Sequence, residues 1–388
     1  MAFQTSRRDF LSAGLMLPAA SAASNLNFLE PTDKPAPTLK SPVKLNYRTL
    51  GQTGLKITTV GFGCMITSDP SVIERAADIG INYFDTARGY QHGNNERMVG
   101  AALGAKRKGL ILSTKSPSDN KTALLKDLDT SLTELKTDYV DIWYLHAKDT
   151  PAAIHDDMIE AQHIAKQQGK IRFAGMSSHA LPKMAEWTVD KKAFDVVLTV
   201  YNFTMDARMD EAIAAVAKTG TGVVAMKIMA GGTHARRSGE PIDPRTQREG
   251  AMLAALKWVL NKPNISTTIP SMTDMDQLDE NLRAMSEKFS PADEKILSAQ
   301  LEQIKPLYCR FCGQCDGACA KGLQVADTLR ILTYADGYGQ FALARERFNE
   351  LPSHHATVRC ADCTECTVKC PYGVRVSERI ARAQELFA

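Results

Sequence analysis

Short apolar runs alternate with helical patterns along most of the chain. Eight of these runs have the length and apolar character of buried strands, namely residues 59–63, 81–85, 110–114, 140–146, 172–177, 196–201, 222–227 and 266–270. Between them, apolar residues recur at the helical period, for example over 71–79, 123–135, 158–168 and 252–260. Strands that alternate with helices pair in parallel through right-handed crossovers. Eight such repeats over about 240 residues predict a closed (β/α)8 barrel.

A short hairpin is predicted just before the first barrel strand. Residues 47–50 and 55–58 flank a glycine-containing turn. The rival fold for the alternating pattern is a doubly wound open sheet. That fold is disfavoured because no G-x-G-x-x-G sequence follows the first strand.

The first 23 residues have the pattern of an export signal. Arg7 and Arg8 precede a mildly apolar run over 11–20, and small residues follow it. Adjacent arginines at this place are typical of the bacterial twin-arginine route, so we expect a periplasmic protein. The alternative is a tail in which two arginines adjoin by chance. Residues 24–45 contain four prolines and few periodic apolar positions, which predicts an extended linker.

Composition excludes some functions and draws attention to the cysteines. The 388 residues include 47 basic and 44 acidic side chains, so there is no electrostatic case for binding nucleic acid. No stretch approaches the roughly 20 apolar residues that a membrane span needs. Eight of the nine cysteines lie in the last 80 residues, which indicates a distinct C-terminal site.

Polar residues stand at the ends of several predicted strands. Asp85 and His146 each end one of the runs, Lys115 directly follows another, and Tyr90 follows Asp85 closely. In a barrel, the C-terminal strand ends face the active site. A buried lysine needs a partner such as Asp85, and a cation beside a tyrosine lowers its pKa. Such a tyrosine can protonate a developing alkoxide, and a histidine can orient the carbonyl. The alternative is that each of the four residues forms its own hydrogen bonds and that they do not share a site.

The segments around these residues resemble the aldo-keto reductase family. The resemblance covers residues 46–290 and rests on the order and spacing of Phe-Asp-Thr-Ala-Arg-Gly-Tyr over 84–90, Asn-Glu at 95–96, Ser-Thr-Lys at 113–115, Asp-Ile-Trp-Tyr-Leu-His over 141–146 and Gly-Lys-Ile-Arg over 169–172. It implies reversible reduction of a small aldehyde or ketone by NAD(P)H. Tyr90 would be the general acid, Asp85 and Lys115 would tune it, and His146 would orient the substrate.

The resemblance also implies a set of cofactor-binding positions: Ser177, Ser178, Met226, Ser271, Glu280 and Asn281. Some of them depart from the family pattern. Serines occupy both places of a usual Ser-Asn pair, Leu198 replaces a glutamine, and Met226 replaces the aromatic residue that stacks on the nicotinamide.

The basic residues that bind a 2′-phosphate in the family are also missing. Ser271 and Gln277 stand where NADP-preferring members carry Lys and Arg, which hold such a phosphate best. We therefore expect weak NADP selectivity. A loop over 231–250, with Arg236, Arg237 and Arg245, could cover a pyrophosphate or be a solvated basic loop. Cys64 is expected to be a packed small residue.

The C-terminal cysteines repeat one spacing, C-x2-C-x2-C-x3-C, which is the bacterial ferredoxin pattern. The two motifs are Cys309, Cys312, Cys315 and Cys319, then Cys360, Cys363, Cys366 and Cys370. In two-cluster ferredoxins the fourth cysteine binds the other cluster. The expected ligand sets are therefore Cys309, Cys312, Cys315 and Cys370 for one 4Fe-4S cluster, and Cys360, Cys363, Cys366 and Cys319 for the other.

Two other uses of the cysteines stay open at this stage. C-x2-C pairs also bind zinc, and disulfides form in oxidising compartments, although the i, i+3 spacing suits them poorly. Residues 291–388 are expected to form a mainly helical ferredoxin-like domain, with a helix over 326–334. Together with the barrel, this domain resembles a subset of aldo-keto reductases that carry a C-terminal 4Fe-4S domain.

Three functions are compatible with this combination. The first is carbonyl reduction coupled to two clusters. The second is an electron-transfer protein whose barrel docks a redox partner without reductase turnover. The third is a barrel enzyme whose clusters only stabilise the fold. Hydride carries two electrons and a cluster accepts one, and the sequence has no flavin signature that would link them.

Overall fold

The computed structural model describes residues 44–231 and 250–388. The export signal, the linker up to residue 43 and the three loop arginines lie outside the described residues. The main sheet contains eight strands, each parallel to the next: β3 (Phe62–Gly63), β4 (Tyr83–Asp85), β5 (Ile111–Ser116), β6 (Val140–Leu145), β7 (Ile171–Ser178), β8 (Val196–Val200), β9 (Gly222–Met226) and β10 (Thr267–Thr268).

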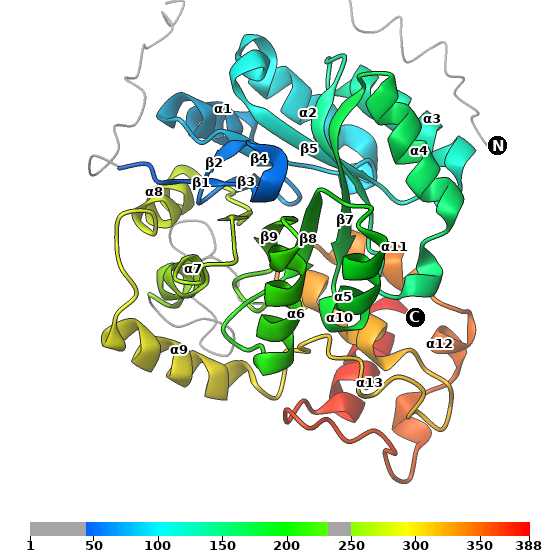
Figure 1. The fold of residues 1–388 in the computed structure, drawn as a ribbon. Coiled ribbons are helices and arrows are strands. Elements are labelled where there is room, and N and C mark those ends of the chain that lie inside the picture. The colour runs from blue at the N-terminus through cyan, green and yellow to red at the C-terminus, as the bar shows by residue number, and fades with distance from the viewer. Residues whose placement is uncertain (1–43, 232–249) are drawn as a thin grey trace, which may run out of the picture. The chain divides into compact units, whose positions relative to one another are not determined.

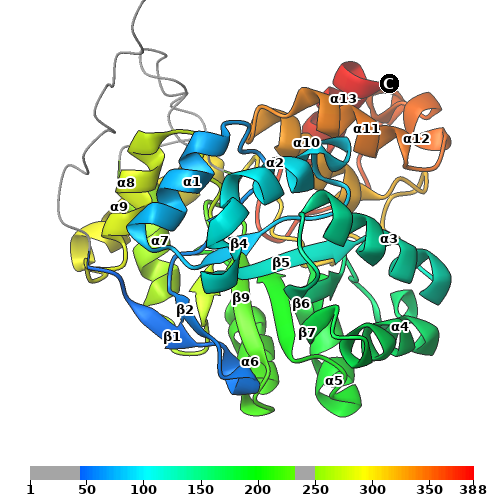
Figure 2. The ribbon, with the colours of Figure 1, turned by 90° about the horizontal axis from the view of Figure 1, so that it is seen from above.

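Parallel contacts between the first and last strands close the sheet. Val60 bridges to Thr268, Gly63 bridges to Ser271, and the Gly61 amide donates to the Thr268 carbonyl at 2.8 Å. Figure 2 looks down on the strands with helices around them. The (β/α)8 barrel predicted from the sequence is therefore confirmed, and all eight expected strands are present.

Helices cover the outside of the barrel. They are α1 (Pro70–Ile79), α2 (Asn94–Leu103), α3 (Lys121–Glu134), α4 (Asp156–Gln167), α5 (Leu181–Lys191), α6 (Ala207–Lys218), α7 (Ala251–Leu260) and α8 (Met275–Arg283). The side chain of Asp69 caps the first of them by accepting from the Ser71 amide, and Gly80 ends it in the left-handed region. None of the helices within residues 44–231 and 250–388 is long and apolar enough to cross a membrane.

The predicted hairpin closes the N-terminal end of the barrel. Its strands β1 (Tyr47–Thr49) and β2 (Lys56–Thr58) pair antiparallel. Leu50 and Ile57 are fully buried and pack with the barrel interior. Gly51 has a φ of +50°, and a Cβ there would lie 2.3 Å from the Gly220 carbonyl, so glycine is required. The opposite end of the barrel is left for a site.

Five further helices follow the barrel. They are α9 (Pro291–Ile304), α10 (Val325–Asp336), α11 (Phe341–Asn349), α12 (His354–Thr357) and α13 (Val376–Phe387). The first packs on α7, where Leu297 joins Ala254 and Lys257 pairs with Asp293 at 2.8 Å. Figure 1 draws the others in orange and red beside the ends of the green strands.

The C-terminal helices and the barrel share a hydrophobic core. Barrel residues Val200 and Ala230 are buried in one cluster with Tyr308, Phe311 and Ile380 of the C-terminal region. The described residues, 44–231 and 250–388, accordingly form one compact unit. The expected helix over 326–334 is α10, which packs against α11 and α13.

Candidate active site

The four predicted catalytic residues converge at the C-terminal ends of β4, β5 and β6. Asp85 ends β4, and the two-residue period of β5 and β6 places Lys115 and His146 on the inner face. Tyr90 begins a short 3-10 helix, η2 (Tyr90–Gly93). The Lys115 Nζ contacts the Asp85 carboxylate and lies 4.9 Å from the centre of the Tyr90 ring. The rings of Tyr90 and His146 meet edge to face, 5.9 Å apart.

Lys115 and Asp85 form a buried ion pair, with side chains 1% and 2% exposed. Ser113 donates to the Asp85 Oδ1 at 2.6 Å, and Lys115 donates to the Thr86 carbonyl at 2.7 Å. Such bonds are needed because a buried pair is stable only when its remaining polar atoms are satisfied. Burial lowers the pKa of Lys115, but Asp85 and Tyr90 outweigh burial and raise it, so the lysine carries its charge.

Tyr90 remains a phenol at neutral pH. Burial raises its pKa, while Lys115 acts in the opposite direction and does not overcome burial. The sequence correctly predicts that Lys115 acts to lower the pKa of Tyr90. It does not predict the larger, opposite effect of burial, so the expected lowering of the Tyr90 pKa is wrong. A protonated tyrosine beside a charged lysine can donate a proton to a reacting oxygen.

His146 is a neutral imidazole. Burial holds its pKa well below the ordinary value, and Lys115 and His179 lower it further. Its amide donates to the Ser116 carbonyl at 3.0 Å, and the next residue, Ala147, has a φ of +54°. A neutral histidine can orient a carbonyl oxygen through one ring nitrogen without adding a second positive charge.

The other residues of the resembling segments frame the site. Glu96 is fully buried, pairs with Arg88 at 2.5 Å and accepts from Thr114 at 2.5 Å. Asn95 donates to the Cys64 carbonyl at 2.8 Å and accepts from Thr86 at 2.6 Å. These contacts tie the loop that carries Tyr90 to the first three strands.

The predicted cofactor residues lie on the strands and loops that complete the rim. Ser177 accepts from the Ala147 amide at 2.8 Å, and Ser178 donates to Asp149 at 3.1 Å. Both serines therefore hold the loops after β6 and β7. Met226 ends β9 and packs against both the barrel core and the core shared with the C-terminal region.

The other predicted cofactor residues lie after β10 and on α8. Ser271 bridges to Gly63 beside the barrel closure. Burial raises the pKa of Glu280. Asn281 is fully buried, and neither polar atom of its amide has a hydrogen-bond partner within the described part of the chain. Buried polar groups are normally satisfied, so this amide is suited to a ligand.

Gln277 and Cys64 have local structural roles. The Gln277 amide nitrogen donates to Thr273 at 2.9 Å and to Asp274 at 2.8 Å, so it is engaged at the start of α8. Cys64 is fully buried, and burial raises the pKa of its thiol. Both observations agree with a packed Cys64 and with a Gln277 that offers no cation to a phosphate.

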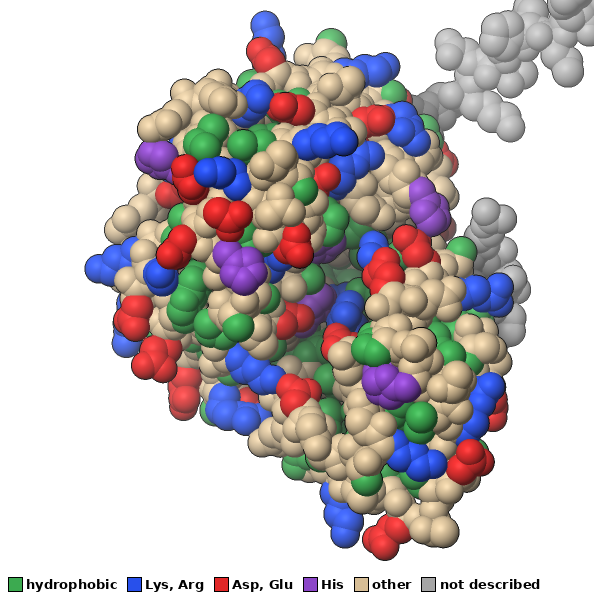
Figure 3. All heavy atoms as spheres, turned by 90° about the vertical axis from the view of Figure 1, so that its right-hand side faces the viewer, with side chains coloured by type: hydrophobic (Ala, Val, Ile, Leu, Met, Phe, Trp, Pro, Cys, Tyr) green, Lys and Arg blue, Asp and Glu red, His purple; other side chains and the backbone are tan. Residues whose placement is uncertain are grey.

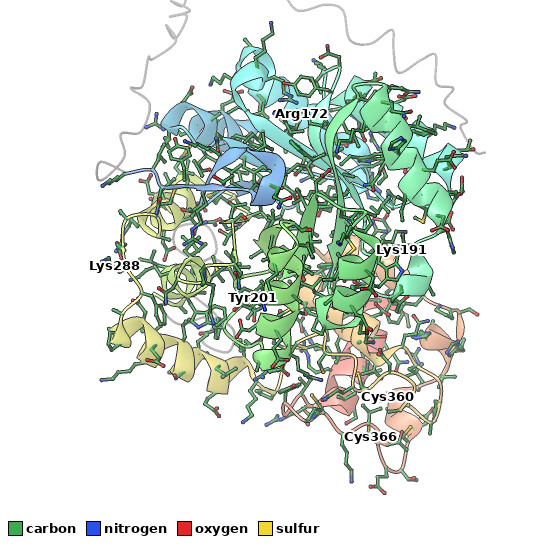
Figure 4. All side chains as sticks on the ribbon, in the orientation of Figure 1. Arg172, Lys191, Tyr201, Lys288, Cys360 and Cys366 are labelled. Carbon is green, nitrogen blue, oxygen red and sulfur yellow. The ribbon has the colours of Figure 1, made fainter. Side chains whose placement is uncertain are left out.

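The eight C-terminal cysteines are free thiols that fall into two groups. Burial raises the pKa of Cys309 to about 12, and the neighbours that raise it further are Cys315, Cys312 and Cys370. Burial also raises the pKa of Cys360, whose neighbours are Cys366, Cys363 and Cys319. The fourth cysteine of each motif thus lies with the other motif. Figure 4 marks Cys360 and Cys366 in the C-terminal domain.

The spacing of the thiols differs from that of a site for one ion. Within residues 44–231 and 250–388, no three Cys, His, Asp or Glu side chains are close enough to hold a single metal ion. The Cys309 Sγ accepts from the Phe311 amide at 3.4 Å. Phe311 has a φ of +58°, which bends the chain between the first two cysteines.

The sequence analysis missed a group of residues between the barrel and the C-terminal helices. Lys227 follows β9, Arg330 and Tyr334 lie on α10, and Arg347 lies on α11. The Lys227 Nζ lies 4.9 Å from the centre of the Tyr334 ring. Lys227 ends a predicted strand, so the strand-end rule could have found it. The residues on α10 and α11 carry no comparable signal.

Comparisons with known proteins agree with this geometry. Residues 68–253 match the aldo/keto reductase family. The chain is 29% identical over 309 residues to an uncharacterized oxidoreductase, YqkF, of Bacillus subtilis, covering 68% of this chain and 98% of that protein. It is 28% identical over 313 residues to L-galactose dehydrogenase of Arabidopsis thaliana, covering 68% and 97%.

A solved structure shares the fold. The holo form of the aldo-keto reductase AKR11C1 from Bacillus halodurans superposes with a TM-score of 0.54 at 24% identity, covering 69% of this chain and 97% of that one. The segment that matches this family lies on a (β/α)8 barrel. The matching segment and the oxidoreductase relatives support an aldo-keto reductase-like oxidoreductase.

Proposed function

We propose that this protein reversibly reduces an aldehyde or ketone, with Tyr90 as the general acid. The observation that carries this proposal is the position of the Tyr90 ring, 4.9 Å from the Lys115 ammonium and 5.9 Å from the His146 ring, at the open end of the barrel. A phenol, a cation and a neutral imidazole at one point are the groups that carbonyl reduction requires.

Each residue has a distinct part in the reaction. His146 orients the carbonyl oxygen toward the Tyr90 hydroxyl. A reduced nicotinamide, when bound, would supply the hydride for the carbonyl carbon and leave as the oxidised cofactor. Tyr90 gives its proton to the oxygen, which becomes the alcohol. The phenolate that remains is stabilised by the Lys115 ammonium until water returns the proton. Asp85 keeps Lys115 charged and in place.

The nicotinamide cofactor is inferred from the fit of the rim. Ser177, Ser178, Met226, Ser271, Glu280 and Asn281 would hold it. The unsatisfied amide of Asn281 supports a polar ligand at this place. We expect weak NADP preference because Gln277 is engaged by Thr273 and Asp274 and offers no positive charge.

We further propose that the two thiol groups hold two 4Fe-4S clusters. Cys309, Cys312, Cys315 and Cys370 would hold one, and Cys360, Cys363, Cys366 and Cys319 the other. Thiolates are the ligands of such clusters, which supply one-electron transfer. The repeated C-x2-C-x2-C-x3-C spacing, which is that of bacterial ferredoxins, favours clusters over zinc.

We also propose that the reaction takes place in the periplasm, because the first 23 residues have the pattern of an export signal. Adjacent arginines indicate a route that carries folded proteins, which agrees with a chain that acquires its clusters before export. A small carbonyl compound would be the substrate, and a redox protein would exchange electrons with the clusters. Fractionation of cells should place the protein in the periplasm and should leave an Arg7→Lys, Arg8→Lys variant in the cytoplasm.

Anaerobically purified protein with its iron and sulfide counted provides the test. We expect NADH or NADPH oxidation that depends on an added aldehyde and falls about 10²–10⁴-fold in Tyr90→Phe, with iron content unchanged. Tyr139→Phe is the matched control, because Tyr139 lies under the Arg107 guanidinium, away from the site.

The same preparation tests the second candidate, an electron-transfer protein without reductase turnover. The Phe311 ring, between two cysteines, lies 5.9 Å from the ring of His179 at the barrel rim, which favours electronic contact between the regions. Clusters that a partner reduces, in a protein that oxidises no nucleotide with any carbonyl, would replace the first proposal with this one.

A further inference from the structure

Lys227 is a charged residue held in a strained conformation between the barrel and α10. It follows β9 directly, and its φ of +55° lies in the left-handed region, which disfavours a side chain such as lysine. The Asn202 side chain donates to the Lys227 carbonyl at 3.0 Å and to the Tyr308 hydroxyl at 3.1 Å. The surroundings therefore impose this backbone, and they direct the lysine toward the C-terminal helices.

The ammonium of Lys227 faces aromatic rings. Its Nζ lies 4.9 Å from the centre of the Tyr334 ring and 5.5 Å from that of Tyr338. Burial lowers the pKa of Lys227, but the two phenols outweigh burial and raise it. The lysine is therefore charged. It lies near enough to the barrel site for its charge to act on Tyr90, whose pKa it lowers.

Lys227 has no carboxylate partner within the described residues. Asp85 is bound to Lys115, and Asp327 pairs with Arg330 at 2.9 Å. Asp149 contacts His179 at 3.1 Å, but burial lowers the pKa of His179, so the charge of Asp149 faces Arg330 instead. An anion beside Lys227 would therefore meet an ammonium that no carboxylate already pairs with.

Arg330 and Tyr334 complete the arrangement from the side of the C-terminal domain. Arg330 donates to the Tyr334 hydroxyl at 3.3 Å, and the Arg330 side chain is 20% exposed. The Tyr334 hydroxyl accepts in this bond, so its own O–H can donate to another acceptor. Figure 3 shows a hollow on one face of the molecule, with basic, acidic and histidine side chains around it. An anion beside Lys227, Arg330 and Tyr334 would meet an ammonium, a guanidinium and a phenol.

We propose that Lys227, Arg330 and Tyr334 bind an anionic group of the substrate, a carboxylate or a phosphate carried next to the reacting carbonyl. This proposal rests on the proposed reduction at Tyr90. With the carbonyl oxygen at Tyr90, a neighbouring anionic group reaches Lys227, whose charge acts on both phenols. The C-terminal domain would then help to select the substrate, in addition to holding its thiols.

Matched pairs of carbonyl compounds test this proposal. Phenylglyoxylate is compared with its uncharged methyl ester, and glycolaldehyde phosphate with glycolaldehyde, in the complete, cluster-containing protein. We expect a higher kcat/KM for the charged member of at least one pair. The pair with the larger difference identifies the anion. Lys227→Met should raise KM for that charged compound about tenfold or more and leave the uncharged one unchanged.

Lys192→Met is the matched control. Lys192 also has a positive φ, of +52°, but it ends α5 and lies away from the site. The same substitution at Lys192 tests the effect of methionine at a positive φ, without changing the charge at the proposed anion site. Equal losses for charged and uncharged compounds in Lys227→Met would overturn the proposal. So would weaker NADH binding, measured by fluorescence, because Lys227 would then serve the phosphates of the cofactor.

Direct binding separates this proposal from the proposed reaction. Oxamate is a carboxylate that the protein cannot reduce, and its binding is measured by calorimetry on nucleotide-loaded protein. Oxamate binding that is lost in Lys227→Met, in a protein without carbonyl reduction, would uphold the anion site and reject the reaction. Reduction with no preference for charged compounds, and no oxamate binding, would reject the anion site alone.

Discussion

Two lysine–tyrosine pairs lie at the mouth of the barrel, and their surroundings make them opposites. Lys115 and Tyr90 belong to the barrel, and the lysine is neutralised by buried Asp85. Lys227 and Tyr334 lie between the barrel and α10, and no carboxylate of the described residues pairs with that lysine. Burial raises the pKa of Tyr90 above its ordinary value. Burial also acts to raise the pKa of Tyr334, but Lys227 and Arg330 lower it to about 8.

The same two functional groups therefore suit different tasks. In the barrel, a neutralised lysine leaves the phenol protonated and available as an acid. At the boundary with the C-terminal helices, a lysine without a carboxylate partner leaves a place for an anion. Residue type alone does not distinguish these pairs, because they differ in their neighbours: a carboxylate lies beside Lys115, and a guanidinium lies beside Tyr334.

The largest expected effect comes from breaking the barrel pair. Lys115→Met leaves the Asp85 carboxylate buried without its cation, which should lower the free energy of unfolding by about 3–5 kcal/mol. Reductase activity should be lost with it. Chemical denaturation and NADH oxidation measure the two effects.

A second buried lysine separates these effects. Lys257 is 8% exposed and pairs with Asp293 at 2.8 Å, outside the site. Lys257→Met should destabilise the protein in a similar way and retain kcat. Full activity in Lys115→Met would contradict the role of the barrel pair, and lost activity in both variants would show only that folding had suffered.

The C-terminal region contributes Tyr334 to one of the two pairs, and it also carries the two proposed thiol sets. Cys370→Ala should remove the first thiol set and reduce iron from about eight to about four atoms per chain. Cys64→Ala, at a cysteine outside both sets, should leave the iron content unchanged. NADH binding should persist in both variants because the cofactor residues belong to the barrel. An unchanged iron content in Cys370→Ala would contradict the exchange of fourth ligands.

The Tyr334 pair predicts a dependence on pH. The phenol faces Lys227 from the barrel, Arg330 on its own helix, and Tyr338, while Arg347 on α11 also lowers its pKa. Above pH 8 it ionises and repels an anionic substrate. KM for the charged carbonyl should therefore rise several-fold between about pH 7 and pH 9. The rise should be absent in Tyr334→Phe and for the uncharged ester.

The same shift has a consequence for stability. The folded-state pKa of Tyr334, about 8, lies below the ordinary value of 10. Ionised Tyr334 therefore stabilises the fold, fully above pH 10, and this contribution is lost as the pH falls through 8. Unfolding measured across this range should lose that trend in Tyr334→Phe. A trend that persisted there would belong to another group.

The smallest effect concerns the contact between the two regions. Tyr372 donates to Asp206, which also pairs with Arg208 at 2.7 Å. Tyr372→Phe should reduce the free energy of unfolding by about 1 kcal/mol or less and slightly weaken the charge preference. Tyr47→Phe, at an exposed tyrosine, should change neither quantity. A large loss of iron in Tyr372→Phe would show that the contact supports the thiol sets instead.

The sequence predicts the barrel well because its signals are local. Strand runs and helical periods recur along the chain, and the strand-end rule brings Asp85, Lys115 and His146 together without knowledge of packing. Burial is a different matter. The pKa of Tyr90 depends on how completely its surroundings exclude water, which no local pattern states.

The second pair could not be predicted because it forms only when distant elements dock. Lys227 ends a predicted strand, so the strand-end rule can find it. Tyr334 and Arg330 lie on a helix, and its sequence pattern does not show that this helix packs against the barrel. The unsatisfied amide of Asn281 is equally hidden, because an asparagine in a sequence does not reveal which partners it lacks.

The exchange of fourth cysteines between the two motifs has a consequence for assembly. In the chain, α10 and α11 separate Cys309, Cys312 and Cys315 from Cys370. Each proposed set of four thiols therefore comes together only after these intervening helices have folded back. A bound cluster would link two segments that are distant in the sequence.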